Sequence, residues 1–271
     1  MKNKKFLAAT VALCLIASCN SPNNSLDEVL NSDLRVESSE RDTFRNPKET
    51  LNFFGLKDNQ TVVELSPGGG WYTEILAPYL KDNGKLIAAH HNPSKGDYYK
   101  RSRERFDTKM AANAIYDKVE VVDLLGVYGE DGSADLVMTF RNLHNWIGGE
   151  DVDKVLAASY KVLKSGGMLG VVDHRAEPGT SLEGMRSSGY MTEAYAIELI
   201  EAAGFKLVNT SEINANIKDT KDHERGVWTL PPSLRLGEKD REKYVAIGES
   251  DRFTLLFQKL SEKPVSSSRT L

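Results

Sequence analysis

Residues 62–74, VVELSPGGGWYTE, decide the fold of this sequence. An apolar, β-branched run ends at an acid, Glu64, and is followed by Ser66, a proline and three glycines; a helix is predicted to begin near Trp71. Glycines at such a turn let the backbone approach a ligand closely and expose amide groups at a helix N-terminus. Between a strand and a helix, this turn favours a ligand-binding crevice over a purely structural bend.

Short apolar runs and helical segments alternate along the rest of the chain. We predict strands at 61–65, 85–90, 119–122, 135–140, 168–173, 206–210 and 253–258, and helices at 71–80, 98–114, 151–163 and 192–203. Nearly continuous apolar strands separated by helix-length segments predict an α/β fold: a doubly wound, mostly parallel seven-stranded sheet with helices on both faces. The long connection before the last strand, which contains Trp228, is a candidate lid or wall.

The N-terminus is typical of an exported protein. Three lysines precede an apolar run at 6–16 that is too short to span a bilayer but suits a secretory signal. Small residues then lead to Cys19, which resembles the lipobox of bacterial lipoproteins. We therefore predict a signal peptide at 1–18, a tether at 19–25 lipidated on Cys19, a folded domain at 26–260 and a flexible tail at 261–271.

The composition and net charge of the chain indicate which classes of partner to expect. The 271 residues include 40% hydrophobic and 27% charged residues, as in globular proteins, and carry a formal charge of −4. Loss of the signal peptide would remove three lysines and no acid, giving −7, so we expect no nucleic-acid partner. Membrane contact is expected through the N-terminal lipid, at the periplasmic face of a bacterial envelope. Asn20 favours the outer over the inner membrane.

The residues quoted above resemble class I S-adenosylmethionine-dependent methyltransferases, whose nucleotide loop reads acid-x-Gly-x-Gly-x-Gly. Here Ser66 replaces the first glycine. The runs ELSPGGGWYTEILAP, FRNLHNW, VVDHRAEPG, KDTKD and GVWTLPP are similar to a subgroup of exported bacterial predicted methyltransferases, over approximately 46–260. The resemblance implies a Rossmann-like methyltransferase fold, S-adenosylmethionine as cofactor, and methyl transfer to a small-molecule acceptor.

The resemblance also implies a set of cofactor contacts: Glu64, Ser66, Gly68, Gly70, His90, Asp123 and Asn142. Asp123 ends the third strand, where the family often has an acid that touches the adenine amino group. His90 stands where the family usually has an acid that holds both ribose hydroxyls. Because a neutral imidazole can accept only one hydrogen bond, this replacement predicts weaker cofactor binding or a different ligand.

A second group of polar residues follows the fourth and fifth predicted strands. Arg141 and His144 come after the fourth strand, and Asp173, His174 and Arg175 end the fifth. The carboxyl ends of strands in such a sheet open onto the ligand crevice, so we expect these groups to converge. As catalytic residues, either histidine could act as a base, Asp173 could orient an imidazole, and Arg141 or Arg175 could hold an anionic acceptor.

Two alternatives stay open. Export away from the cytoplasm, where the cofactor is made, allows a non-catalytic lipoprotein that binds a nucleoside-like ligand. A metal-dependent enzyme on the same fold would use His144, Asp173 and His174 as ligands. Adjacent Asp173 and His174 would point to opposite faces of a strand, so no metal is assigned. The sequence leaves open the acceptor, the atom attacked and the oligomeric state.

Overall fold

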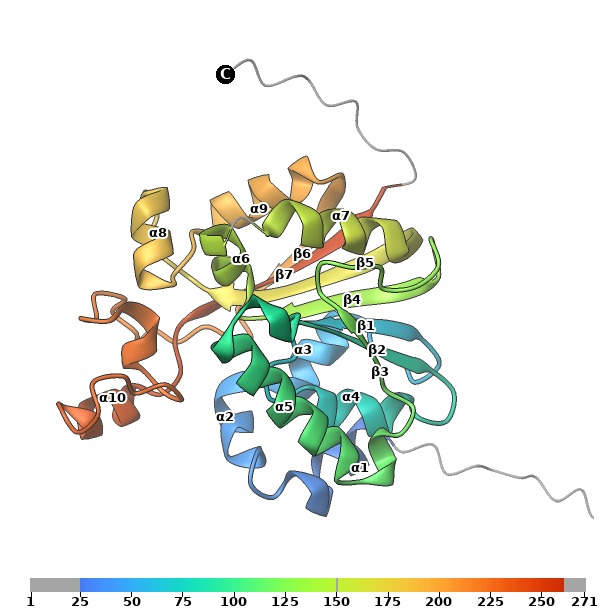
Figure 1. Cartoon of the computed structure of the whole chain (residues 1–271). Helices are drawn as coiled ribbons and strands as arrows, with labels where there is room; N and C mark the ends of the chain where they lie inside the picture. Colours follow the sequence, from blue (N-terminus) through green and yellow to red (C-terminus); the bar gives the residue numbers. More distant parts are fainter. Residues whose placement is uncertain (1–24, 150, 261–271) are drawn as a thin grey trace, which may run out of the picture.

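The computed structural model describes residues 25–149 and 151–260, and seven strands of this part form one sheet (Figure 1). The strands are β1 (Thr61–Leu65), β2 (Lys85–His90), β3 (Glu120–Asp123), β4 (Ala134–Phe140), β5 (Leu163–His174), β6 (Phe205–Ser211) and β7 (Arg252–Lys259). The predicted signal peptide, Cys19 and the predicted tail lie outside the described residues.

The strand order is β3-β2-β1-β4-β5-β7-β6. Neighbours from β3 to β5 pair in parallel, and β7 runs antiparallel to both β5 and β6. The prediction of a mostly parallel seven-stranded sheet is therefore confirmed. Predicted strand ends agree with the structure to within one residue, except that β5 begins at Leu163.

Ten α-helices and five short 3₁₀ turns accompany the sheet in the described residues. The α-helices are α1 (Leu26–Leu30), α2 (Asp42–Arg45), α3 (Pro47–Phe53), α4 (Thr73–Leu80), α5 (Asp97–Ala111), α6 (Leu143–Gly149), α7 (Val152–Val162), α8 (Leu182–Ser188), α9 (Glu193–Ala202) and α10 (Arg241–Ile247). The 3₁₀ turns are η1 (Asp33–Arg35), η2 (Ser39–Arg41), η3 (Pro93–Lys95), η4 (Ala114–Tyr116) and η5 (Gly226–Thr229). The four predicted helices correspond to α4, α5, α7 and α9. The α-helices that the sequence did not reveal have seven residues or fewer, too few to display a helical period.

Both faces of the sheet are covered, as predicted. Successive side chains of a strand point to opposite faces, so Val63 and Val62 join different cores. Val63 packs in a cluster with residues of α6, α7 and α9, including Val155, whereas Val62 packs in a cluster with residues of α1, α3 and α4, including Ile75. Figure 1 shows α7 and α9 on one side of the strands and α3 and α4 on the other.

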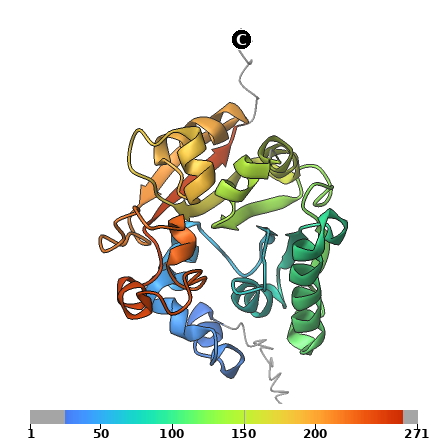
Figure 2. The same ribbon diagram turned by 60° about the vertical axis from the view of Figure 1, so that its left-hand side comes forward.

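The connection 212–251 between β6 and β7 contacts the N-terminal helices. The amide of Asn46 donates to the Ile213 carbonyl at 2.7 Å, and the Arg41 guanidinium pairs with Glu249 at 2.6 Å. Figure 2 shows the two segments side by side, blue beside orange-red. The N-terminal helices and the connection 212–251 thus meet near the carboxyl ends of the central strands. Among the described helices, none has the length and apolar character needed to cross a bilayer.

Candidate functional site

The turn after β1 adopts the left-handed backbone that its glycines predict. Gly68 and Gly70 have φ of 60° and 79°, and Ser66, which replaces the family's first glycine, has φ of 51°. A non-glycine residue in this region is strained, so surrounding contacts must hold it. The Asn142 side-chain amide donates to the Ser66 carbonyl at 3.2 Å, which links the turn to the end of β4.

A cavity of about 350 Å³ opens beside this turn. Its lining includes Glu64, Ser66, Gly68 and Asn142, four of the predicted cofactor contacts. A Cβ atom built on Gly68 would meet no protein atom within 4 Å, so the turn leaves open space where a ligand can approach the backbone. Gly70 differs, because its Cβ would lie 3.3 Å from the Lys109 side chain. The turn and its cavity therefore fit a cofactor held by backbone amides.

Glu64 faces this cavity from the end of β1 and is almost completely buried. Thr73 Oγ1, at the start of α4, donates to its carboxylate at 2.6 Å. Burial raises the pKa of Glu64 to about 7, because the low-dielectric surroundings disfavour the charged form. Near neutral pH the carboxyl group can thus exist in either form, and it can accept or donate a hydrogen bond.

His90 and Asp123 lie at the ends of β2 and β3 and are not among the cavity's lining residues. His90 Nε2 lies 3.1 Å from the Gly68 carbonyl oxygen, and burial lowers the pKa of the ring, so it is neutral with a single N–H to donate. Asp123, which pairs with His90 across β2 and β3, accepts from the Asn92 amide at 2.5 Å. The predicted adenosine contacts are therefore engaged with the protein itself.

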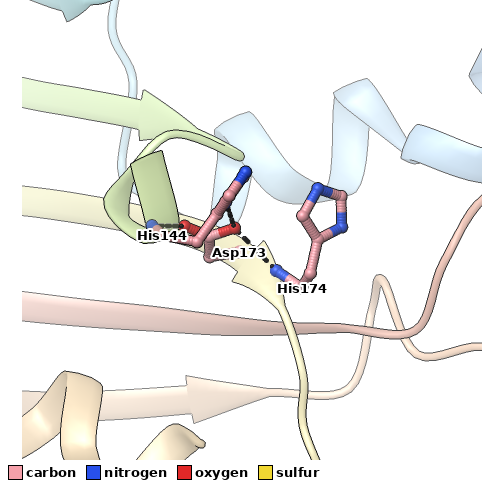
Figure 3. A group of neighbouring side chains, drawn as sticks. All are labelled: His144, Asp173 and His174. Atoms are coloured by element: carbon pink, nitrogen blue, oxygen red, sulfur yellow. Dashed lines mark hydrogen bonds and ion pairs between the residues drawn. The ribbon is translucent and has the colours of Figure 1, made fainter. Parts of the chain in front are cut away.

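His144 and Asp173 form a buried pair where β4 and β5 end (Figure 3). His144 Nδ1 lies 2.7 Å from Asp173 Oδ1, and the backbone N–H of His144 donates to Asp173 Oδ2 at 3.0 Å. A carboxylate at Nδ1 fixes the proton on that nitrogen and leaves Nε2 as an acceptor. This arrangement can serve as a general base whose ring is held in one orientation.

His174 lies beside this pair, with ring centroids 4.9 Å apart from His144. Its Nδ1 is 2.5 Å from Ser250 Oγ, and burial, followed by the charge of His144, lowers the pKa of His174 well below its usual value. One ligand atom from each of His144, Asp173 and His174 lies within 4.8 Å of the others, despite strand alternation. Asp173 Oδ1 folds back onto the His174 amide, so its two oxygens already accept three hydrogen bonds. The carboxylate is therefore better suited to orienting His144 than to binding a metal.

The two arginines predicted to hold an anion lie in different surroundings. Arg141 lines the cavity with φ of 62°, and its N–H donates to the Val172 carbonyl at 2.7 Å. Its guanidinium has one carboxylate partner, Glu249, at 3.7 Å. Arg175 pairs with Glu212 at 2.7 Å and with two further carboxylates within 4.0 Å. The structure thus leaves Arg141, and not Arg175, facing a ligand space.

Several cavity residues were not found by sequence reasoning. They are Arg41, Arg45, Lys109 and Phe140. Arg45 stacks over the Trp71 ring, 4.4 Å from its centroid. The i,i+4 spacing of Arg41 and Arg45 in the run RDTFR is a weak local signal, but nothing in it indicates contact with Glu249, more than 200 residues away.

Comparisons with known proteins agree with this geometry. The sequence model of the family described as "Methyltransferase domain" matches residues 63–171. No curated protein matches the sequence. A S-adenosylmethionine-dependent methyltransferase from Aquifex aeolicus is 16% identical, with a TM-score of 0.54 over 87% of this chain and 99% of that one. A putative sarcosine dimethylglycine methyltransferase from Galdieria sulphuraria is 17% identical, with a TM-score of 0.55 over 83% and 87%.

The solved structures establish the fold, and not the reaction. The [4+2]-cyclase SpnF is also similar, at 16% identity and a TM-score of 0.59 over 86% of each chain. That protein is a cyclase, so the fold by itself does not specify methyl transfer. The match over residues 63–171 covers the glycine turn, Asp123 and Arg141. Residues 63–171 are therefore similar to the methyltransferase domain, and this similarity, on a fold shared with solved methyltransferases, supports an enzyme with S-adenosylmethionine as its cofactor.

Proposed function

We propose that this protein is an exported, lipid-anchored S-adenosylmethionine-dependent methyltransferase that acts on a small-molecule acceptor. The observation that carries the proposal is the glycine turn with Glu64, which opens on a cavity where β1 and β4 end. This is the place where sheets of this type bind ligands. Glu64, Gly68 and Asn142 would hold the cofactor, with His90 and Asp123 supporting its adenosine side.

The chain's own residues then have distinct tasks. When bound, S-adenosylmethionine would supply an electrophilic methyl group, which would pass from the sulfonium sulfur to a nucleophilic atom of the acceptor in an in-line displacement and leave S-adenosylhomocysteine. Because such a displacement depends on alignment, the main task of the protein is to position both partners. His144 Nε2 would take a proton from the acceptor, while Asp173 keeps the ring oriented. The ring centroid of Trp228, which belongs to the connection 212–251, lies 6.2 Å from that of His144. An acceptor that reaches His144 would therefore contact this connection.

Calorimetry on the full chain in mild detergent tests the cofactor site. We expect S-adenosylhomocysteine to bind, and Gly68→Asp to weaken binding at least about ten-fold, because a carboxylate would project into the cavity. Gly237→Asp is the matched control, since Gly237 has φ of 62° and equally open surroundings. Absence of binding at millimolar ligand would contradict the proposal. Binding without turnover on any acceptor would favour the non-catalytic lipoprotein.

Lipid labelling in a bacterial host tests the anchor separately. The predicted lipobox places the acyl chains on Cys19, the only cysteine left after cleavage at residue 18. We expect Cys19→Ser to abolish incorporation of labelled palmitate, with Cys14→Ser as the control that keeps it. Continued acylation of Cys19→Ser would refute the anchor without affecting the cofactor site.

A further inference from the structure

Four arginines surround one carboxylate at the edge of the cavity. Glu249 pairs with the guanidinium groups of Arg41 at 2.6 Å, Arg45 at 3.2 Å, Arg252 at 3.2 Å and Arg141 at 3.7 Å. Within the described residues, none of these arginines pairs with another carboxylate. Guanidinium groups stay protonated in proteins, so the cluster carries a net charge of +3. We call these five residues the arginine cluster.

The cluster is buried as well as unbalanced. Glu249, Arg45 and Arg252 are each at most 3% exposed. Burial lowers the pKa of Arg45 well below its usual value, and the nearby charge of Arg141 lowers it further. Burial by itself would raise the pKa of Glu249, but the arginine charges lower it to about 2. One carboxylate is too little to compensate four clustered cations, of which Arg45 and Arg252 are buried and Arg41 and Arg141 are partly exposed.

Arg45 and Arg141, two members of the cluster, line the cavity. Arg45 Nη2 is buried and has no hydrogen-bond partner among the described residues, although the guanidinium is held in place by stacking on Trp71. Arg141 lines the cavity on a strained backbone, and strain of this kind is retained mainly where a side chain must be presented. A buried donor of a charged group without a partner is costly, and a bound anion would recover that cost.

The other lining charges do not supply the missing anion. Lys109 is paired with Glu74, and Glu64 is partly protonated near neutral pH. The carboxylate of S-adenosylmethionine could offset one positive charge, but its ammonium and sulfonium groups would add two. Arg41, Arg45, Glu249 and Arg252 also lie outside residues 63–171, the part that matches the methyltransferase domain. The cluster is therefore suited to recognising the acceptor.

We propose that the methyl acceptor carries an oxyanion group, a carboxylate or a phosphate, which Arg45 and Arg141 hold at the edge of the cavity. The planar guanidinium fork matches both oxyanions, because each can accept two parallel N–H donors. Arg41 and Arg252, with Glu249, hold these two side chains in position. This inference rests on the proposed function and adds the chemical class of its substrate.

The test uses inorganic phosphate and succinate as probes on the full chain in mild detergent, by calorimetry in chloride buffer. At least one probe should bind, and saturating S-adenosylhomocysteine should change its affinity by less than about three-fold. Arg141→Gln and Arg45→Lys should each weaken the probe at least about ten-fold, as expected for a lost charge-assisted fork, and by a larger factor than they weaken S-adenosylhomocysteine. Arg175→Gln, at a similarly buried position with several carboxylate partners, is the matched control and should bind the probe normally.

The melting temperature distinguishes a role of Arg141 in anion binding from a purely structural role. Without added anion, Arg141→Gln should melt no lower than the parent protein, because it removes one charge from an overcharged cluster; a clearly lower Tm would overturn the proposal. Competition between S-adenosylhomocysteine and the probe would assign the arginines to the cofactor carboxylate and also overturn it. Binding of S-adenosylhomocysteine without either probe would overturn it while leaving the methyltransferase proposal intact. If a probe binds but S-adenosylhomocysteine does not, the result would count against the proposed function instead.

Discussion

Glu249 and Asp251 are two residues apart, yet they lie in ionic networks of opposite balance. Around Glu249, four arginines share one carboxylate. Around Asp251, Arg175 and Lys221 share four carboxylates, with Lys221 lying 3.1 Å from Asp251 and 2.8 Å from Glu177. The first network faces the cavity, and the second joins the connection 212–251 to the ends of β5 and β6.

The difference shows how a ligand site can be separated from a structural network. Where each cation has its own carboxylates, the protein satisfies its charges internally and gains little from a bound ion. Where buried cations outnumber carboxylates, the folded protein has excess positive charge that a bound anion can neutralise. From the sequence, Arg141 and Arg175 were equal candidates for holding an anion. In the structure, Arg175 pairs with three carboxylates, whereas Arg141 pairs with Glu249, which it shares with three other arginines.

The largest expected effect comes from removing the single carboxylate of the arginine cluster. Glu249→Gln leaves four clustered arginines, two of them buried, without their shared counter-charge, so the free energy of unfolding should fall by about 3–5 kcal/mol. Asp251→Asn, the matched change in the other network, should cost about 1 kcal/mol or less, because other carboxylates still surround Arg175 and Lys221. Urea denaturation measures both. Equal losses would remove the distinction between the networks, and phosphate should restore part of the stability of Glu249→Gln alone.

A smaller effect is expected from the pH dependence of stability, in which Glu64 and Glu249 act in opposite directions. Burial raises the pKa of Glu64 from 4.5 to about 7, so between these values the folded protein keeps a proton that the unfolded chain has lost. The contribution of Glu64 to the free energy of unfolding should therefore fall by about 3 kcal/mol as the pH rises from 4.5 to 7. The pKa of Glu249 is lowered to about 2, so its contribution is present above pH 4.5 and lost as the pH falls to 2.

Glu64→Gln isolates the first of these contributions. A glutamine can still accept the hydrogen bond from Thr73, so the variant removes the titration and keeps the contact. In urea denaturation between pH 4.5 and 7.5, the free energy of unfolding of the parent minus that of Glu64→Gln should fall by about 3 kcal/mol as the pH rises. Glu120→Gln, at an exposed position, serves as the control and should keep the pH profile of the parent. Identical pH profiles for Glu64→Gln and the parent would mean that Glu64 titrates normally in the folded protein.

Much of the fold could be predicted because its signals are local. Apolar β-branched runs gave the strands, and α4, α5, α7 and α9 were long enough for their periodicity to be read. The convergence of His144 with Asp173 followed from a general property of parallel sheets, since both residues follow the carboxyl ends of neighbouring strands. The short helices α1 to α3 escaped prediction, and with them Arg41 and Arg45.

The sequence by itself determined the doubly wound sheet, the glycine turn and the place of the polar residues at the strand ends, because backbone preference and hydrophobic period are written in neighbouring residues. Only the tertiary structure decided which charges meet. Residues near 45 and 250 come together because helix α2 and the segment just before β7 pack against each other near the carboxyl ends of the central strands. Ionic balance depends on distance in space and on burial, and neither is encoded by spacing along the chain.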